Sequence, residues 1–325
     1  MSQSFPRRVP GWFVYGDHPA ISCLLARTVF WTTVMFFSGL LVWPHPVAAE
    51  WVEWIADTKV RIANNDNINQ TFFRDEKESD TAATPFVSLG RYYQLTDYTR
   101  LRFTTDFEAG VHKEFELLNY YSAGLMLAIW HKLGIGPNVP RLNAHASATT
   151  KNVRDNARDS SIYNIGLNVD KRFTPRLNVR IDYDYDVRDG KDGEMTMKNT
   201  MLDIDTDVYD LKSQTLSFIG NYLVTNDVLI TASYSYRRGD FISTCALDKF
   251  DIVWDAEDVL ATTSDNVFGG LIYKLEGSAN VLSLNASYAL GRHTSLNLGY
   301  QRIEGKSDKL EWKSSIVSAS FMYSY

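Results

Sequence analysis

The sequence predicts an all-β protein in which twelve antiparallel strands form a transmembrane, up-and-down β-barrel, with fourteen strands as the alternative count. Two observations carry this prediction: apolar and polar side chains alternate along many short segments, and short and long polar connections alternate between those segments. Successive side chains of a strand point to opposite faces, so a stripe of period two excludes a helix. The pattern therefore predicts strands with one face toward lipid and one toward water.

The segment 176–188 shows the alternation most clearly, with Leu177, Ile181 and Tyr185 on one face and Arg180 and Asp182 on the other. Charges at successive positions cannot lie in a dry core, but they can line a hydrated lumen. The predicted lumen-lining residues share this polar face of their strands: Arg100, Arg102, Asp106, Glu108, Asp170, Arg172, Arg180, Asp182, Asp184 and Asp186. Rings of such charges select among permeating ions, whereas fully paired charges would fill the lumen.

The connections between the predicted strands are of two lengths. Short turns fall at 96–97, 174–175, 225–227 and 291–293, and the longest connections are expected at 64–81, 189–208 and 239–265. Short turns at one rim and long loops at the other are typical of bacterial membrane barrels, which have even strand numbers. An even count requires 267–276 and 280–290 to form one long strand. Along this strand the apolar side chains shift from odd-numbered to even-numbered positions between Leu275 and Leu282, which predicts a β-bulge near Gly277 and Ser278.

The first 49 residues have the composition of a secretory signal peptide. Arginines precede an apolar run of 16 residues, 28–43, and small residues follow at Val47, Ala48 and Ala49. The run is shorter than the ~20 residues that a membrane-spanning helix needs, so we expect cleavage after Ala49 and a barrel domain at 50–325. The formal net charge of −6, without a basic patch, argues against nucleic-acid binding.

The last strand ends the chain on an aromatic ring. One face of this segment is apolar and comprises Val317, Ala319, Phe321, Tyr323 and Tyr325. With the leader and the alternating hairpins, this strand resembles those of Gram-negative outer-membrane β-barrel proteins. The resemblance implies export through the periplasm, insertion by the barrel-assembly machinery and contact with outer-membrane lipid and lipopolysaccharide. The basic residues at or above the outer rim are either solvated loop charges or candidates to pair lipopolysaccharide phosphates, and they are Lys151, Arg154, Arg158, Arg237 and Arg238. The sequence does not predict the oligomeric state.

No cofactor or metal site is predicted. The aspartate series from Asp182 and from Asp203 lack the glycine and glutamate that a calcium loop requires at its sixth and twelfth positions. His145 and Ser147 share a strand face, and Asn164 or Asn168 on the next strand could orient the imidazole. The trio resembles the His/Ser/Asn arrangement of outer-membrane phospholipase A. In this sequence, however, both side chains should point inward, away from a lipid substrate.

Three functions follow from these patterns. We expect a passive, porin-like channel for small hydrophilic solutes rather than an enzyme. The alternative is a closed barrel that serves as a structural or export-system component of the envelope, for example in exopolysaccharide export. A lipid-hydrolysing enzyme that uses His145 and Ser147 is the remote alternative.

Overall fold

The computed structural model describes residues 50–190 and 208–325. The predicted signal peptide, 1–49, and most of the predicted loop 189–208 lie outside the described residues. Within 50–190 and 208–325, no helix is both long and apolar enough to cross a bilayer.

The described chain is built almost entirely of strands, with one short α-helix, α2, at Phe250–Ala256. The strands are β1 (Glu50–Asn65), β2 (Asp80–Thr96), β3 (Thr99–His112), β4 (Tyr120–Lys132), β5 (Arg141–Val153), β6 (Ser160–Arg172), β7 (Leu177–Gly190), β8 (Leu211–Leu223), β9 (Val228–Cys245), β10 (Ala261–Ser264), β11 (Leu271–Ala289), β12 (Thr294–Lys306) and β13 (Glu311–Ser324).

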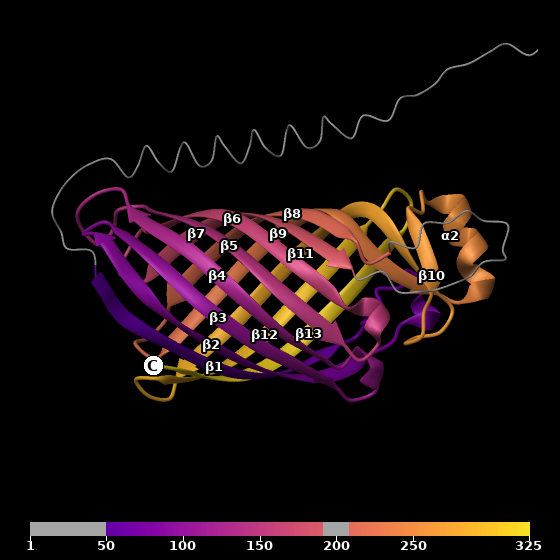
Figure 1. Ribbon diagram of the computed structural model, residues 1–325, viewed down its shortest axis with the longest axis horizontal. Helices are drawn as coiled ribbons and strands as arrows, with labels where there is room; N and C mark the ends of the chain where they lie inside the picture. Colours follow the sequence, from indigo (N-terminus) through magenta and orange to yellow (C-terminus); the bar gives the residue numbers. More distant parts are fainter. Residues whose placement is uncertain (1–49, 191–207) are drawn as a thin grey trace, which may run out of the picture. The chain divides into compact units, whose positions relative to one another are not determined.

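Twelve of these strands close into a barrel, and every pairing is antiparallel (Figure 1). Each strand pairs with the next along the chain, β9 pairs with β11, and β13 returns to β1 with Thr58 opposite Tyr323. Closure leaves no unpaired edge among the twelve, as a lipid environment requires. The four-residue β10 is additional and pairs only with the outer end of β11. The predicted twelve-strand barrel is confirmed.

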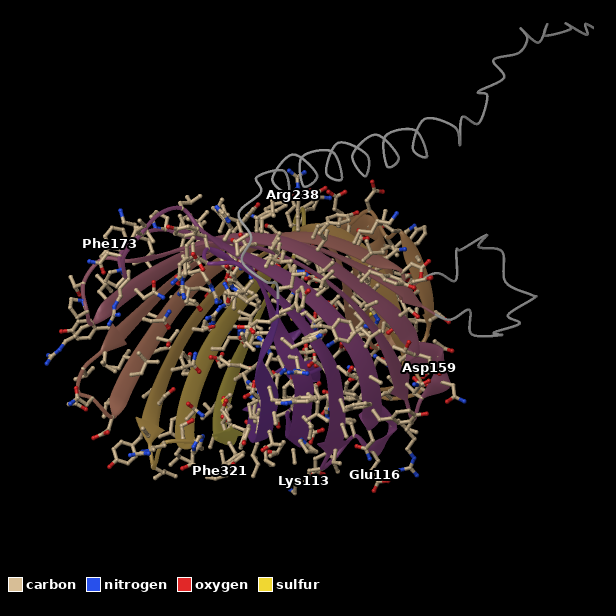
Figure 2. The ribbon with its side chains drawn as sticks, turned by 60° about the vertical axis from the view of Figure 1, so that its left-hand side comes forward. Lys113, Glu116, Asp159, Phe173, Arg238 and Phe321 are labelled. Carbon is tan, nitrogen blue, oxygen red and sulfur yellow. The ribbon has the colours of Figure 1, made fainter. Side chains whose placement is uncertain are left out.

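The outward face of the barrel wall is apolar and exposed. On opposite parts of the ring, Ile165 is 53% exposed and Leu298 is 58% exposed. Phe173, in the short β6–β7 turn, and Glu116, in the longer β3–β4 connection, lie at opposite ends of the barrel (Figure 2). Short turns therefore define the inner rim and longer connections the outer rim.

The long strand β11 is one continuous element, as predicted, but the expected bulge near Gly277 is wrong. Its pairing with β9 runs from Leu271 to Tyr288 without a register shift. The apolar side chains change faces along β11 because its outer part extends past the part that faces the bilayer. That outer part packs its apolar side chains against the outer connections. There Tyr273 and Leu275 are buried in a cluster with residues of α2 and of the β1–β2 connection. Gly277 serves close packing, since a Cβ atom there would lie 2.5 Å from the Phe241 ring.

Candidate functional site

The two sides of the barrel interior differ in chemistry. Most of the inward-facing charged residues lie on β1, β3 and β5 to β7, with uncharged residues of β2 and β4 between them. Strands β8 to β13 direct mainly hydroxyl and amide groups inward, and these bond to one another across neighbouring strands. The bonded pairs are Ser217 with Ser235 (2.8 Å), Asn221 with Thr231 (2.8 Å) and Ser283 with Gln301 (3.3 Å). The lumen therefore has one charged wall and one largely neutral, hydroxylated wall.

A cavity of about 360 Å³ lies against the charged wall. The residues that line it come from β3 to β7: Arg102, Met126, Ala128, Trp130, Arg141, Asn143, His145, Asn168, Asp170, Arg180, Asp182 and Asp184. Five of the predicted lumen-lining residues are among them. The sequence analysis missed Arg141, although it lies directly opposite Asp170 in the β5–β6 register.

Most charges at this cavity are paired. Arg141 Nε donates to Asp170 Oδ1 at 2.8 Å, and Arg180 Nε donates to Asp182 Oδ2 at 3.0 Å. Arg102 is the least compensated cation, because the nearest carboxylate oxygen, on Asp57, is 4.0 Å from its guanidinium. Its buried Nε has no hydrogen-bond partner among the described residues.

The other predicted lumen residues lie outside this cavity. Four of them hydrogen-bond to polar side chains on their own or neighbouring strands: Arg100 to Gln94, Asp106 to Ser88, Glu108 to Tyr120 and Asp186 to Asn164. Arg172 instead donates to the backbone carbonyl of Pro175 in the β6–β7 turn, at 2.6 Å. The structure thus places Arg172 at the inner rim.

His145 pairs with a carboxylate. Its Nε2 lies 3.0 Å from Asp184 Oδ1 on β7, across the intervening strand β6. The β6 residue between them is Gly166, where a Cβ atom would lie 2.6 Å from His145 Nε2 and 2.3 Å from Asp184 Oδ1. Of the two asparagines predicted as candidates to orient the imidazole, Asn168 donates to Asn143 at 3.2 Å and Asn164 donates to Asp186 at 2.9 Å. The inward direction predicted for His145 holds, so the ring faces the cavity. No group of three or more His, Cys, Asp or Glu side chains within 50–190 and 208–325 is placed to hold a metal ion.

The connection between β9 and β11, residues 246–270, is here called the strap. It contains α2 and β10. Toward one side, Lys249 pairs with Glu76 in the β1–β2 connection at 3.1 Å, and Glu257 accepts a hydrogen bond from the backbone N–H of Leu310, between β12 and β13, at 2.7 Å. The strap is therefore joined to two outer connections on this side.

Toward the other side, the strap reaches the three remaining outer connections. Ala261 packs in one cluster with Val208 and Tyr209, before β8. Phe268 stacks edge-on against Phe115, between β3 and β4, with ring centroids 4.7 Å apart. Asp265 Oδ1 accepts a bond from Arg158, between β5 and β6, at 2.8 Å.

These contacts fix where the strap lies. In the ring of strands, the connections β3–β4 and β5–β6 are not neighbours of the β9–β11 hairpin. A segment that followed the rim would reach only the β7–β8 and β12–β13 connections. The strap contacts all five other outer connections and must therefore cross the mouth of the barrel.

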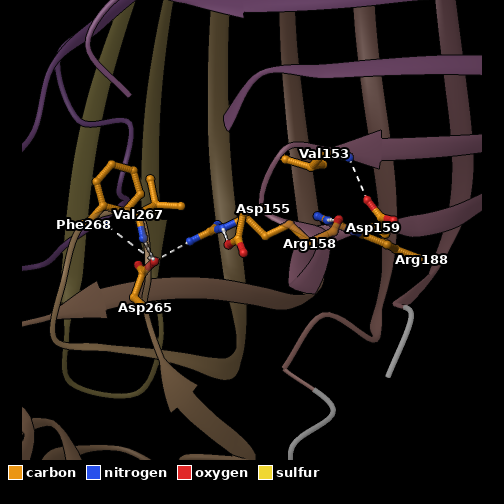
Figure 3. Close-up of polar contacts among 8 residues, drawn as sticks. All are labelled: Val153, Asp155, Arg158, Asp159, Arg188, Asp265, Val267 and Phe268. Atoms are coloured by element: carbon orange, nitrogen blue, oxygen red, sulfur yellow. Dashed lines mark hydrogen bonds and ion pairs between the residues drawn. The ribbon is translucent and has the colours of Figure 1, made fainter. Parts of the chain in front are cut away.

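A buried ion-pair cluster, here called the latch, holds the strap to the β5–β6 connection (Figure 3). Arg158 bonds Asp265 of the strap and also donates from Nε to Asp155 at 3.2 Å. The Arg158 side chain is only 9% exposed and that of Asp265 is fully buried. Nearby, burial raises the pKa of Tyr209 to about 12, so its hydroxyl stays neutral beside the latch. Arg158 is thus occupied by two carboxylates, whereas Arg154 and Arg238 are exposed.

Comparisons with known proteins show the fold. No known protein family and no curated protein sequence matches the chain. An outer-membrane channel from Pseudomonas putida F1 superimposes with a TM-score of 0.51 at 12% identity, over 87% of this chain and 100% of that one. The chain has the outer-membrane β-barrel fold. Two other similar structures are a KdgM porin in complex with disordered oligogalacturonate (TM-score 0.45, 10% identity, 83% and 99% covered) and the translocator domain of the autotransporter NalP from Neisseria meningitidis (0.39, 11%, 94% and 98%).

Proposed function

We propose that the protein is an outer-membrane channel for small hydrophilic solutes whose outer mouth is covered by the strap in the state described. The observation that carries this proposal is the cavity of about 360 Å³ inside the barrel wall, lined by paired charges. In a barrel without a permeation pathway, side chains would fill this space, as they do in the smallest barrels. Paired charges facing a cavity keep it hydrated and give a polar solute exchangeable hydrogen-bond partners.

The two walls suggest how a solute is handled. On the charged wall, Arg102 has the weakest carboxylate partner and is the group best able to attract an anionic part of a solute. The opposite wall offers hydroxyl and amide groups, such as those of Ser235 and Asn221, which hydrogen-bond without a net charge. Passage requires the strap to move, because it crosses the outer mouth of the barrel.

The proposal includes a cellular location. The barrel fold, the apolar outward face and the terminal strand from Val317 to Tyr325 support insertion into the outer membrane after export through the periplasm. Outer-membrane phospholipids and lipopolysaccharide are then its surroundings, and the barrel-assembly machinery is the proposed partner during insertion. The inward direction of His145 argues against a lipid-hydrolysing role.

The strap favours one second candidate. A barrel closed permanently at its mouth would serve as a structural or export-system component of the envelope and would not conduct. The buried latch and the contacts with all five outer connections favour this reading. The two candidates differ in one measurable property, namely whether the lumen conducts when the strap is absent.

The register of β9 and β11 allows a clean test. Cys245 and Leu271 are direct partners, so residues 246–270 can be replaced by an Asn-Gly turn that closes the same hairpin. Both proteins would be reconstituted in planar lipid bilayers after their folding is checked by heat-modifiable gel migration. We expect rare conductance steps from the wild type and frequent, stable steps from the strapless barrel. A folded strapless barrel that never conducts would refute the channel and support the closed barrel.

A further inference from the structure

The inner end of the β1–β2 hairpin carries an irregularity that changes which way a tryptophan points. Trp51 is opposite Tyr93 and Trp54 is opposite Arg91, so three steps along β1 match two steps along β2. In a regular strand, residues three apart face opposite sides. The extra residue turns both indoles outward, where Trp51 is 52% and Trp54 is 64% exposed. The Trp51 ring also meets the Tyr93 ring edge-on at 5.1 Å.

Between these indoles lies a cation. The guanidinium carbon of Arg91 is 4.4 Å from the Trp54 ring centroid and 5.1 Å from that of Trp51. Both distances are within the range of cation–π attraction. Two rings restrict the rotation of the guanidinium, so its planar fork of donors is held in place before any ligand arrives.

Arg91 differs from Arg141 and Arg180 at the cavity because no carboxylate neutralises it. Arg141 and Arg180 each bond an aspartate, whereas within 50–190 and 208–325 no ion pair or hydrogen bond involves the Arg91 guanidinium. Val87 and Leu89, the preceding outward residues on β2, are apolar. The chain thus interrupts a lipid-facing stripe with an uncompensated charge at the inner rim, five residues before β2 ends at Thr96.

We propose that Arg91, Trp51 and Trp54 form a binding site for the phosphate of one phospholipid in the periplasmic leaflet. At this depth the headgroup phosphate is the anion that a lipid-facing guanidinium can reach, and Arg binds phosphate through two parallel hydrogen bonds. The exposed indoles supply apolar surface at the level of the glycerol backbone, where amphipathic rings are favoured. The inner rim selects a phospholipid over lipopolysaccharide, which belongs to the opposite leaflet. This inference depends on the proposed membrane location but not on conduction.

The same rim provides a matched control. Lys171, at the end of β6, lies over the single Phe173 ring, with Nζ 5.1 Å from its centroid. It is also a cation at the inner rim beside an aromatic ring, but it lacks the second ring and the planar fork. A general attraction between cations and headgroups would affect Arg91 and Lys171 alike, whereas a built site would affect Arg91 alone.

The test is lipid binding to the purified barrel in a non-ionic detergent, counted by native mass spectrometry. Wild type, Arg91→Gln, Trp54→Leu and the control Lys171→Gln would be titrated with phosphatidylglycerol and, as a phosphate-free lipid, with diacylglycerol of the same chains. Hydrogen bonds to a charged group predict a loss of affinity of about tenfold or more for the first bound phosphatidylglycerol in Arg91→Gln. We expect a smaller loss in Trp54→Leu and none in Lys171→Gln.

Wild-type affinity for phosphatidylglycerol in Arg91→Gln would overturn the proposal, and so would equal binding of diacylglycerol by the wild type. A loss of the same size in Lys171→Gln would likewise reduce the site to a general surface charge. Inorganic phosphate at the same concentration serves as a competitor. It would block phosphatidylglycerol binding at a site for free anions, whereas a lipid site would keep its affinity. Conductance is a separate readout, so failure of the channel proposal leaves this result interpretable.

Discussion

Replacing Arg158 by leucine should release the strap. The substitution keeps an apolar stem but removes the cation that bonds both Asp155 and Asp265. Two carboxylates would then remain in a site where the Asp265 side chain is fully buried. Breaking a buried ion pair by removing one partner costs about 3–5 kcal/mol. The cost falls on the closed state, because both carboxylates become hydrated once the strap has moved.

The free-energy cost to the closed state predicts a large effect on how often the channel is open. A loss of about 3 kcal/mol from the closed state raises the open-to-closed ratio by roughly a hundredfold. Single-channel recordings in planar bilayers would measure this as the fraction of time spent open by wild type and Arg158→Leu. The strapless barrel marks the upper limit of opening.

The control is the neighbouring pair between Arg154 and Glu116. These side chains are 57% and 65% exposed and join the β5–β6 and β3–β4 connections without involving the strap. Exposed pairs are worth ~0–1 kcal/mol, so Arg154→Leu should change opening by less than about fivefold. Equal open fractions in Arg158→Leu and wild type, with both folded, would refute the latch.

Three further predictions use other parts of the molecule. Arg180→Glu and Arg102→Glu should each shift the reversal potential of the strapless barrel toward cation selectivity, and unchanged potentials would contradict a lumen location. The hydrogen bond from Lys249 lowers the pKa of Asp75 below 3.8. This link to the strap is therefore present at higher pH and is lost as pH falls through the lowered pKa, so openings should increase only in acid below about pH 4 and stay constant between about pH 5 and 8. Ser147→Ala should leave phospholipid hydrolysis at the wild-type background in a fluorogenic lipase assay, and a specific drop would revive the enzyme.

The direction of each side chain was predictable because a strand alternates strictly and locally. The period of two at 177–187 alone assigns Ile181 outward and Asp182 inward, and the structure agrees. The same reasoning failed where tertiary packing changes the environment. Leu275 and Leu282 have opposite parity, but one meets the outer connections and the other meets lipid, so no bulge is needed.

Contacts between residues that are distant in the sequence were less accessible to sequence reasoning. Arg141 and Asp170 are 29 residues apart, and their contact depends on an exact β5–β6 register that the pattern alone leaves open. Arg158 and Asp265 are 107 residues apart and meet only because the strap crosses the mouth. The predicted connection at 239–265 begins too early, because β9 continues to Cys245. The alternating pattern carries no information about how residues 246–270 fold. The real bulge, beside Trp51, lies where the apolar spacing shifts by one residue.

Side chains that face a wet interior and side chains that face lipid alternate along each strand, and two adjacent residues on β9 allow a direct test of this alternation. Ala232 lies opposite Leu284 on the outward face, and Ser233 lies opposite Ser283 on the inward face. Ala232→Cys and Ser233→Cys, each in a Cys245→Ala background, would be reconstituted in vesicles and treated with a charged, membrane-impermeant maleimide. We expect labelling of the cysteine at 233 and protection of the cysteine at 232. Equal labelling, or labelling at 232 alone, would contradict the alternation.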